Sequence, residues 1–287
     1  SSTVASSKRF RDAMSQLDVQ QLEGADYGRL ERLNVESPHG SVFSAPSWAA
    51  YLAFPHYCLG VFKGRELVGG GVVPLSDGHV SRYVPFTPWI GLVGRSESEG
   101  ENLALAQGVA EYLLARHREV TLTLPPEWTD IRAFTWAGMR AHIRYTYQGQ
   151  EPSYEKRLVL HDCVIRREGR HREDFWCLVA WQTGDSEVET LQDWKRVYYW
   201  KANKGGQHHA DCMNAAIKTS NQHGAGFDMV GCNSPQRGLF KRSFGGRLTP
   251  YYAISTCDAK DLREDHARRS DLQDVSARAD IARASGV

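Results

Sequence analysis

Apolar residues along the chain recur at a spacing of two in some segments, which predicts strands, and at three to four in others, which predicts helices. Residues 57–62 and 67–73 are apolar runs joined by Lys63-Gly64-Arg65-Glu66, which predicts a β-hairpin. Residues 101–117 place their apolar side chains on one helical stripe, and a strand is expected over 120–124. The first half of the chain is therefore expected to mix strands with helices.

The second half shows the same order of patterns. The predicted elements are strands over 175–180, 197–200 and 226–230 and a helix over about 208–222. A Pro-containing loop is then expected before Phe240, and a pair of glycines separates it from a strand that contains Tyr251-Tyr252.

The two halves share a spacing of 106 residues. It separates Val120 from Gly226, Phe134 from Phe240, and Tyr145 from Tyr251. Three matches at one offset, in the same strand–loop–aromatic–strand order, predict two similar halves. Each would be an α/β unit (α+β) of mixed sheet and flanking helices. We expect domains over 1–150 and 151–257, followed by a charged tail or helix over 258–287.

Composition excludes several classes of protein. The 287 residues are 41% apolar and 10% aromatic, which excludes disorder or a collagen-like repeat as a description of the whole chain. The 35 Lys+Arg and 34 Asp+Glu give a net charge of +1, which argues against a continuous nucleic-acid-binding face but not against a local basic patch. No apolar stretch approaches the roughly 20 residues of a membrane span. Six dispersed cysteines and no signal-peptide pattern favour reduced thiols and a cytoplasmic location.

Common catalytic motifs are missing from the sequence. There is no G-x-x-x-x-G-K-[ST], G-x-G-x-x-G, G-x-S-x-G or H-E-x-x-H pattern. Of the eleven histidines only His208-His209 adjoin, and neighbours on a helix do not face one another. No metal site is expected.

Two charged residues lie in apolar surroundings in the second half. Asp228 falls within the strand pattern Phe227-Asp-Met-Val-Gly231, so it is either a hydrogen-bonded structural carboxylate or a functional one. Lys241 lies between aromatic residues and precedes two glycines, which permit close backbone approach. It is either an oxyanion-stabilising group or a surface lysine with a buried stem. The position 106 residues earlier is Thr135, so chemistry that uses the lysine belongs to the second half.

These residues resemble a known family. The pattern FDMVG…LFKRSFGGRLTPYY is similar to the closing motif of Fem-type aminoacyltransferases and their GNAT-fold relatives. The segments 43–48, 67–74, 85–92 and 128–134 resemble the family's earlier segments, so the matches span about residues 40–256. The resemblance implies two tandem GNAT-like domains. It also implies transfer of an amino acid, such as alanine, from aminoacyl-tRNA to an amine, usually on a peptidoglycan precursor peptide.

The resemblance also assigns roles to residues. Lys241, in the matching Phe240-Lys241 pair, would stabilise the tetrahedral intermediate, Phe240 would contact substrate, and Asp228 would orient groups or accept a proton. The expected acceptor contacts are Arg82, Trp89 and Tyr147, although the two aromatic residues also fit core positions. The basic residues Arg166, Arg167, Arg170 and Arg172 would either bind tRNA phosphates or form a solvated charged loop.

The chain departs from the family in two respects. It has no heptad-rich segment for a helical arm. The arginine- and lysine-rich helix that such proteins often have early in their second domain is missing, and the basic stretch here is residues 165–172. These departures favour a trimmed relative from a peptide or peptidyl-nucleoside antibiotic pathway. The acyl-CoA loop [QR]-x-x-G-x-[GA] at the start of a helix is also missing; the nearest string, residues 221–226, precedes a strand.

The sequence therefore predicts an aminoacyl-tRNA-dependent N-aminoacyltransferase. Its donor ester is already activated, so no cofactor is needed, and its acceptor is a peptide or a nucleotide-linked peptide. Two alternatives stay open: an acyl-CoA-dependent N-acyltransferase on the same fold, and a non-catalytic binding module.

Overall fold

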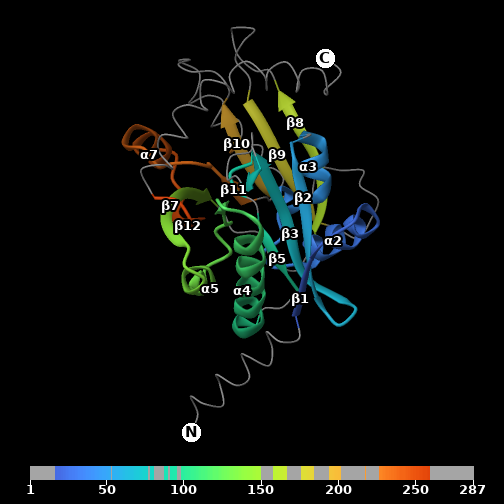
Figure 1. Ribbon diagram of the computed structural model, residues 1–287. Helices are drawn as coiled ribbons and strands as arrows, with labels where there is room; N and C mark the ends of the chain where they lie inside the picture. The colour runs from blue at the N-terminus through green and yellow to red at the C-terminus, as the bar shows by residue number, and fades with distance from the viewer. Residues whose placement is uncertain are drawn as a thin grey trace. The chain divides into compact units, whose positions relative to one another are not determined.

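The computed structural model describes residues 17–52, 54–76, 78–80, 87–89, 91–95, 98–149, 158–166, 176–183, 194–201, 217 and 226–258 (Figure 1). In the segments 158–166, 176–183 and 194–201 it describes the backbone alone. The chain forms two compact units, and each is described by itself. Unit 1 is Ser1–Ile143 with Tyr251–Ala259, and unit 2 is Arg144–Pro250 with Lys260–Val287.

Unit 1 contains an antiparallel sheet. Its strands are β1 (Leu17–Gln21), β2 (His56–Lys63), β3 (Glu66–Ser76) and β4 (His79–Val80) in that order, with β5 (Leu92–Gly94) paired to β3. The predicted hairpin is confirmed, because β2 and β3 pair from Lys63 and Glu66 outward. Its turn uses Gly64 at a φ of 63°, a conformation that favours glycine.

Unit 1 also contains helical segments, of which those over 24–36 and 99–116 pack on the sheet. They are α2 (Gly24–Glu36), the short 3₁₀ turn Val42–Ser44, α3 (Pro46–Leu52), α4 (Glu99–Arg116) and α5 (Arg132–Trp136). The predicted helix over 101–117 is confirmed as α4, and its apolar stripe, including Leu103, Val109 and Leu113, is buried against Leu59 and Val61 of β2. Removing this stripe from water stabilises unit 1.

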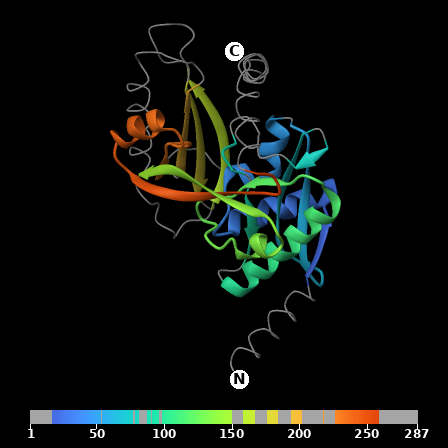
Figure 2. The ribbon, with the colours of Figure 1, turned by 60° about the vertical axis from the view of Figure 1, so that its left-hand side comes forward.

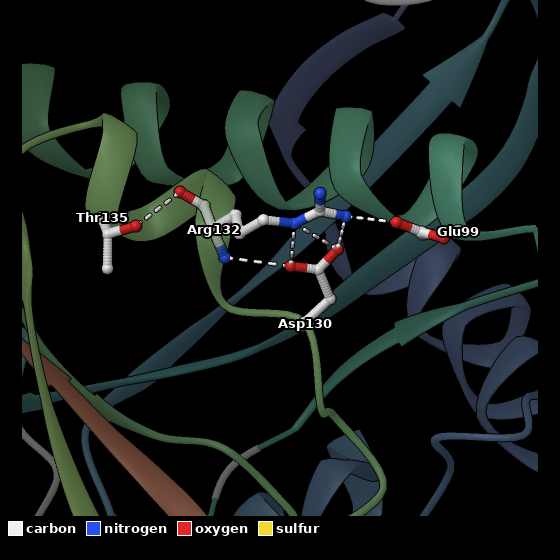
Figure 3. A network of polar contacts seen from close by, with 4 residues as sticks. All are labelled: Glu99, Asp130, Arg132 and Thr135. Carbon is white, nitrogen blue, oxygen red and sulfur yellow. Dashed lines mark hydrogen bonds and ion pairs between the residues drawn. The ribbon is translucent and has the colours of Figure 1, made fainter.

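A polar network fixes α5 beside the first turn of α4 (Figure 3). Arg132 Nε donates to Asp130 Oδ1 at 3.0 Å, and the same guanidinium pairs with Glu99. Asp130 Oδ1 also accepts the backbone N–H of Arg132 at 3.1 Å, and Thr135 Oγ1 donates to the Arg132 carbonyl at 2.8 Å. The hydrogen bond from Arg132 holds the pKa of Asp130 below its ordinary value.

Unit 2 contains a mixed sheet. Its strand order is β7 (Arg140–Gly149), β11 (Gly226–Asp228), β10 (Trp194–Lys201), β9 (Trp176–Thr183) and β8 (Leu158–Arg166). The β10–β11 pair is parallel and the other pairs are antiparallel. The strands expected over 175–180 and 197–200 are confirmed, whereas the one expected over 226–230 ends at Asp228. The helix expected over 208–222 and the tail over 258–287 lie outside the described residues, apart from 217 and 258.

The 106-residue repeat corresponds to two strand–helix–strand segments. The first is β6 (Thr121–Thr123), α5 and β7. The second is β11, α7 (Pro235–Arg242) and β12 (Arg247–Ser255), drawn in orange in Figure 2. The first strand of each segment pairs with the last strand of the other. Phe227 pairs with Gly149, and Ala253 pairs with Thr123.

One prediction about the second segment was wrong. The Pro-containing stretch before Phe240 is the helix α7 and not a loop. Ser234 Oγ accepts the backbone N–H of Arg237 at 3.4 Å, and Pro235 occupies the first helical position, where no N–H is needed. Proline therefore begins a helix here.

The predicted α/β class, with mixed sheet and flanking helices, is confirmed. Within the described ranges, every helix is too short or too polar to span a bilayer.

Candidate functional site

Asp228 lies at the end of β11 and is fully buried. Its Oδ1 accepts hydrogen bonds from Thr146 Oγ1 at 2.6 Å and from the backbone N–H of Val230 at 2.8 Å. Its Oδ2 accepts one from Gln148 Nε2 at 2.8 Å. Charged groups lose favourable hydration on burial, and these donors replace part of it. Asp228 is thus a buried carboxylate with three hydrogen-bond donors, and the choice between a structural and a functional role stays a prediction.

Thr146 and Gln148 are residues that the sequence analysis missed. Both come from β7, which pairs with β11 so that Gln148 lies opposite Asp228. They alternate along the strand with Tyr145 and Tyr147, so they point to the face opposite to the tyrosines. This polar–aromatic alternation was the signal available in the sequence.

Lys241 lies in the last turn of α7 and is only 9% exposed. Its ammonium donates to three successive backbone carbonyls, those of Met229, Val230 and Gly231, the last at 3.1 Å. An ammonium has three donors, so these bonds use all of them. The prediction of a surface lysine with a buried stem is wrong, because the charged end itself is enclosed.

Burial changes the protonation equilibrium of Lys241. Desolvation lowers its pKa to about 8, against the opposing effect of the Asp228 charge. Arg237, four residues earlier on α7, lowers it further. Lys241 therefore exchanges its proton much closer to neutral pH than an exposed lysine does.

The backbone between these two charges has an uncommon conformation. Val230 has a φ of 47° and Gly231 a φ of 55°, both in the left-handed region. For a β-branched residue this conformation costs about 1–2 kcal/mol. Asp228 holds the N–H of Val230 and Lys241 holds its carbonyl, so both charged residues offset the strain at one residue.

Cys232 follows this turn and is buried as a free thiol. Its backbone N–H donates to the Tyr145 carbonyl at 3.1 Å, and Asn233 Oδ1 accepts the Tyr145 N–H at 2.7 Å. Burial raises the pKa of the Cys232 thiol, which keeps it protonated at neutral pH and makes it a poor nucleophile. We therefore assign Cys232 to packing beside Lys241.

The remaining predicted substrate contacts lie in different surroundings. Phe240 is half-buried and packs edge-on against Phe244, with ring centroids 5.0 Å apart. Tyr147 is half-buried in β7, and its carbonyl accepts the N–H of Met229 at 2.9 Å. Unit 2 therefore brings both residues close to the turn that Lys241 holds.

Trp89 belongs to unit 1 and is 1% exposed. It packs edge-on against Phe43 and Tyr251, with centroid distances of 6.0 and 5.5 Å. The core position that the sequence analysis left open for Trp89 is therefore the one it occupies.

Most of the arginines predicted to bind substrate or tRNA lie outside the described part of the chain. Arg82, Arg167, Arg170 and Arg172 lie outside the described residues, and Arg166 ends β8 with only its backbone described.

The Asp–Lys pair exists in one copy of the repeat. The positions 106 residues before Asp228 and Lys241 are Leu122 and Thr135, which cannot replace either charge. Among the described residues, no group of three or more His, Cys, Asp and Glu side chains is arranged to hold a metal ion. The second strand–helix–strand segment is therefore our candidate site.

The chain matches no protein-family model and no curated protein. Among solved structures it is similar to a tandem GNAT protein from the clavulanic acid biosynthesis pathway, determined without AcCoA, at 10% identity and a TM-score of 0.42, over 84% of this chain and 98% of that one. It is also similar to a putative acetyltransferase from Pyrococcus horikoshii at 9% identity and a TM-score of 0.44, over 85% of this chain and 90% of that one. A third similar structure is FemX, at 9% identity and a TM-score of 0.44, over 86% of this chain and 99% of that one. At these levels the similarities define neither a family nor an activity.

Proposed function

We propose that the chain is an N-acyltransferase that transfers an aminoacyl group from aminoacyl-tRNA to an amine of a peptide or nucleotide-linked peptide. One observation supports this most directly. The two segments that resemble the Fem-type motif, around Asp228 and around Phe240-Lys241, fold together, and their charged residues hold the same backbone residue, Val230. The segments that carry the resemblance therefore lie close together in unit 2.

In this proposal the reaction needs no redox change. The neutral acceptor nitrogen forms a bond to the ester carbon, and the carbonyl oxygen becomes an oxyanion. Collapse of this intermediate breaks the bond to the ribose oxygen of the tRNA, which leaves with the proton that the nitrogen loses. The products are an amide and deacylated tRNA. Holding the two substrates together supplies much of the rate enhancement.

Lys241 provides the positive charge that stabilises the oxyanion. An ammonium in a desolvated position interacts strongly with a developing negative charge. Because its three donors are engaged, the oxyanion must replace one carbonyl. The carbonyl of Gly231 is the one exchanged, since its 3.1 Å bond is only partly buried and is the longest of the three.

Asp228 acts as a positioning residue in this scheme. Three donors occupy its oxygens and it has no exposed surface, so it is poorly placed to take a proton from a substrate. It fixes the turn over 229–231 and raises the pKa of Lys241, which favours the ammonium form.

Transfer assays with purified protein test the proposal. Radiolabelled aminoacyl-tRNA is incubated with candidate amines, with RNase in one arm and acyl-CoA as donor in another. We expect amide product that requires intact aminoacyl-tRNA. Product that resists RNase, or that forms only from acyl-CoA, contradicts the tRNA donor; no product from any donor favours a binding module.

A lysine variant tests the assigned residue. Lys241→Met retains most of the side-chain length but removes the charge, and we expect it to lower kcat by about 10²-fold or more. Lys63→Met, an exposed lysine of unit 1 that lies 3.8 Å from Glu101, is the matched control. Circular dichroism shows whether each variant is folded. Unchanged kcat in folded Lys241→Met protein would remove Lys241 from the mechanism.

A further inference from the structure

The chain has a balanced net charge, but one of its segments has an excess of positive charge. The 29 residues between Asp228 and Asp258 contain no Asp or Glu, although the whole chain has 34 acidic residues in 287. The same stretch contains four basic residues, Arg237, Lys241, Arg242 and Arg247. Three of these belong to α7 and the fourth begins β12.

The charges on α7 repel one another. This eight-residue helix has three cations and no acidic residue. Arg237 lies in its first turn, where the helix dipole is positive and a cation is unfavourable. Lys241 lies four residues later, and like charges at that spacing destabilise a helix. Lys241 and Arg242 lie in the last turn, where cations are favourable, so the unfavourable position is that of Arg237, and a bound anion would relieve both effects there.

Two of these cations face solvent. Arg237 and Arg242 are exposed, whereas Lys241 is engaged with backbone carbonyls. Within the described part of the chain, no carboxylate lies in ion-pair distance of Arg237 or Arg242. Their guanidinium groups are therefore accessible to phosphate, which they bind in a bidentate geometry.

Exposed apolar side chains accompany these arginines in unit 2. Leu239 of α7 is 68% exposed, Leu248 of β12 is 50% exposed, and Tyr145 of β7 is 40% exposed. Tyr145 lies close to the start of α7, because its backbone bonds with Cys232 and Asn233. Surfaces that bind single-stranded nucleic acid combine basic residues for the phosphates with exposed aromatic rings on which bases stack.

We propose that α7, with the adjoining parts of β7 and β12, binds the single-stranded end of an RNA. Arg237 and Arg242 contact phosphates, and Tyr145 stacks on a base. The identity of the RNA rests on the proposed function, in which the donor amino acid is carried at the end of a tRNA. The contact then lies in the same unit as Lys241, and the arginines over 166–172 are not needed for it.

A binding experiment without chemistry tests this surface. A fluorescent, deacylated single-stranded RNA ending in CCA is titrated with protein at several salt concentrations, and anisotropy gives the affinity. The double variant Arg237→Gln/Arg242→Gln is compared with Arg65→Gln/Arg118→Gln, which removes two exposed arginines of unit 1 and changes the net charge equally. Tyr145→Leu tests the stacking contact.

We expect the α7 double variant to bind at least about tenfold more weakly at 0.1 M salt. The slope of log affinity against log salt concentration should fall by about 1.4, since each phosphate contact to a single strand contributes about 0.7. The unit 1 control should match the wild type. Tyr145→Leu should weaken binding with little change in slope, because stacking involves no counterion release.

Failure of this inference differs from failure of the proposed function. Equal binding by the two double variants, or no RNA binding by the wild type, overturns the α7 surface even if transfer from tRNA is observed. RNA bound at α7 together with transfer only from acyl-CoA contradicts the proposed function and leaves the surface in place. Displacement of the RNA by equimolar CoA assigns the arginines to a CoA phosphate instead and overturns the RNA assignment.

Discussion

Asp228 and Lys241 bind the two backbone polar groups of one residue, Val230. The carboxylate of Asp228 accepts the N–H of Val230 at 2.8 Å, and the ammonium of Lys241 donates to the carbonyl of Val230. Val230 has a left-handed φ of 47°, so the two charges stabilise a conformation that valine rarely adopts. A buried charge pair thus acts through the backbone between its members, and any substrate that engages Lys241 must alter this turn.

Replacing Asp228 should destabilise unit 2. Asp228→Asn has one acceptor oxygen where three donors converge, so at least one donor loses its acceptor and the buried charge is lost. We expect the free energy of unfolding to fall by about 1–3 kcal/mol, measured by urea denaturation. Asp258→Asn is the control, because Asp258 is 64% exposed in its ion pair with Arg140 and should change stability by about 0–1 kcal/mol. Equal effects of the two substitutions would contradict the role assigned to Asp228.

The two glycines after α7 should tolerate substitution unequally. Gly245 and Gly246 have φ values of 81° and 94°, so alanine is strained at either position. A Cβ at Gly245 meets nothing within 4 Å, whereas one at Gly246 lies 3.0 Å from the Gln148 carbonyl oxygen. Gly246→Ala should therefore cost at least about 1 kcal/mol more unfolding free energy than Gly245→Ala. Equal losses would show that strain alone requires these glycines and that the close approach to β7 does not.

The Asp130–Arg132 pair predicts an acid-dependent contribution to the stability of unit 1 (Figure 3). The pKa of Asp130 is held below its ordinary 3.8, so its contribution is present above that pH and is lost as the pH falls through the folded-state pKa. Asp130→Asn should lower Tm at pH 7, and the difference from the wild type should shrink as the pH falls below the ordinary carboxyl pKa of 3.8. Asp18→Asn, which replaces an exposed carboxylate of β1, is the control. A Tm difference that is constant with pH would contradict this assignment.

Local patterns predicted about half of the described elements, and none of β1, α2, α3, β4 and β5. The β2–β3 hairpin follows from two apolar runs joined by a polar turn, and α4 follows from an apolar stripe at helical spacing. Strand β8 was not predicted, because His161 and Asp162 interrupt its apolar residues at the point where its pairing with β9 shifts register. The sequence predicts a loop where helix α7 lies, because proline usually interrupts a helix, although Ser234 before Pro235 is a helix-capping residue.

The candidate site was predicted only in part. Asp228 and Lys241 were found because charges stand out among apolar neighbours. Their partners were not, since Thr146 is 82 residues from Asp228 and meets it only through the pairing of β7 with β11. The carbonyls that bind Lys241 depend on a left-handed valine, and nothing in the residue type of Val230 indicates that conformation. Long-range pairing and backbone strain are not encoded in local periodicity.

Lys241 should give the chain a stability that rises with pH in the alkaline range. Its pKa is about 8 in the folded protein and near 10.5 when unfolded, so between these values the unfolded chain binds the additional proton. The free energy of unfolding then increases with pH by at most about 1.4 kcal/mol per unit. The charged and titratable groups around the ammonium are Asp228, Cys232 and Arg237. Because the Cys232 thiol also titrates, Cys232→Ala is introduced both into the protein with Lys241 and into the Lys241→Met variant. The rise should be present with Lys241 and absent in Lys241→Met, measured by urea denaturation from pH 7 to 10.5. A parallel pH dependence in the two proteins would mean that the buried ammonium keeps an ordinary pKa, and that the three carbonyls replace its hydration in full.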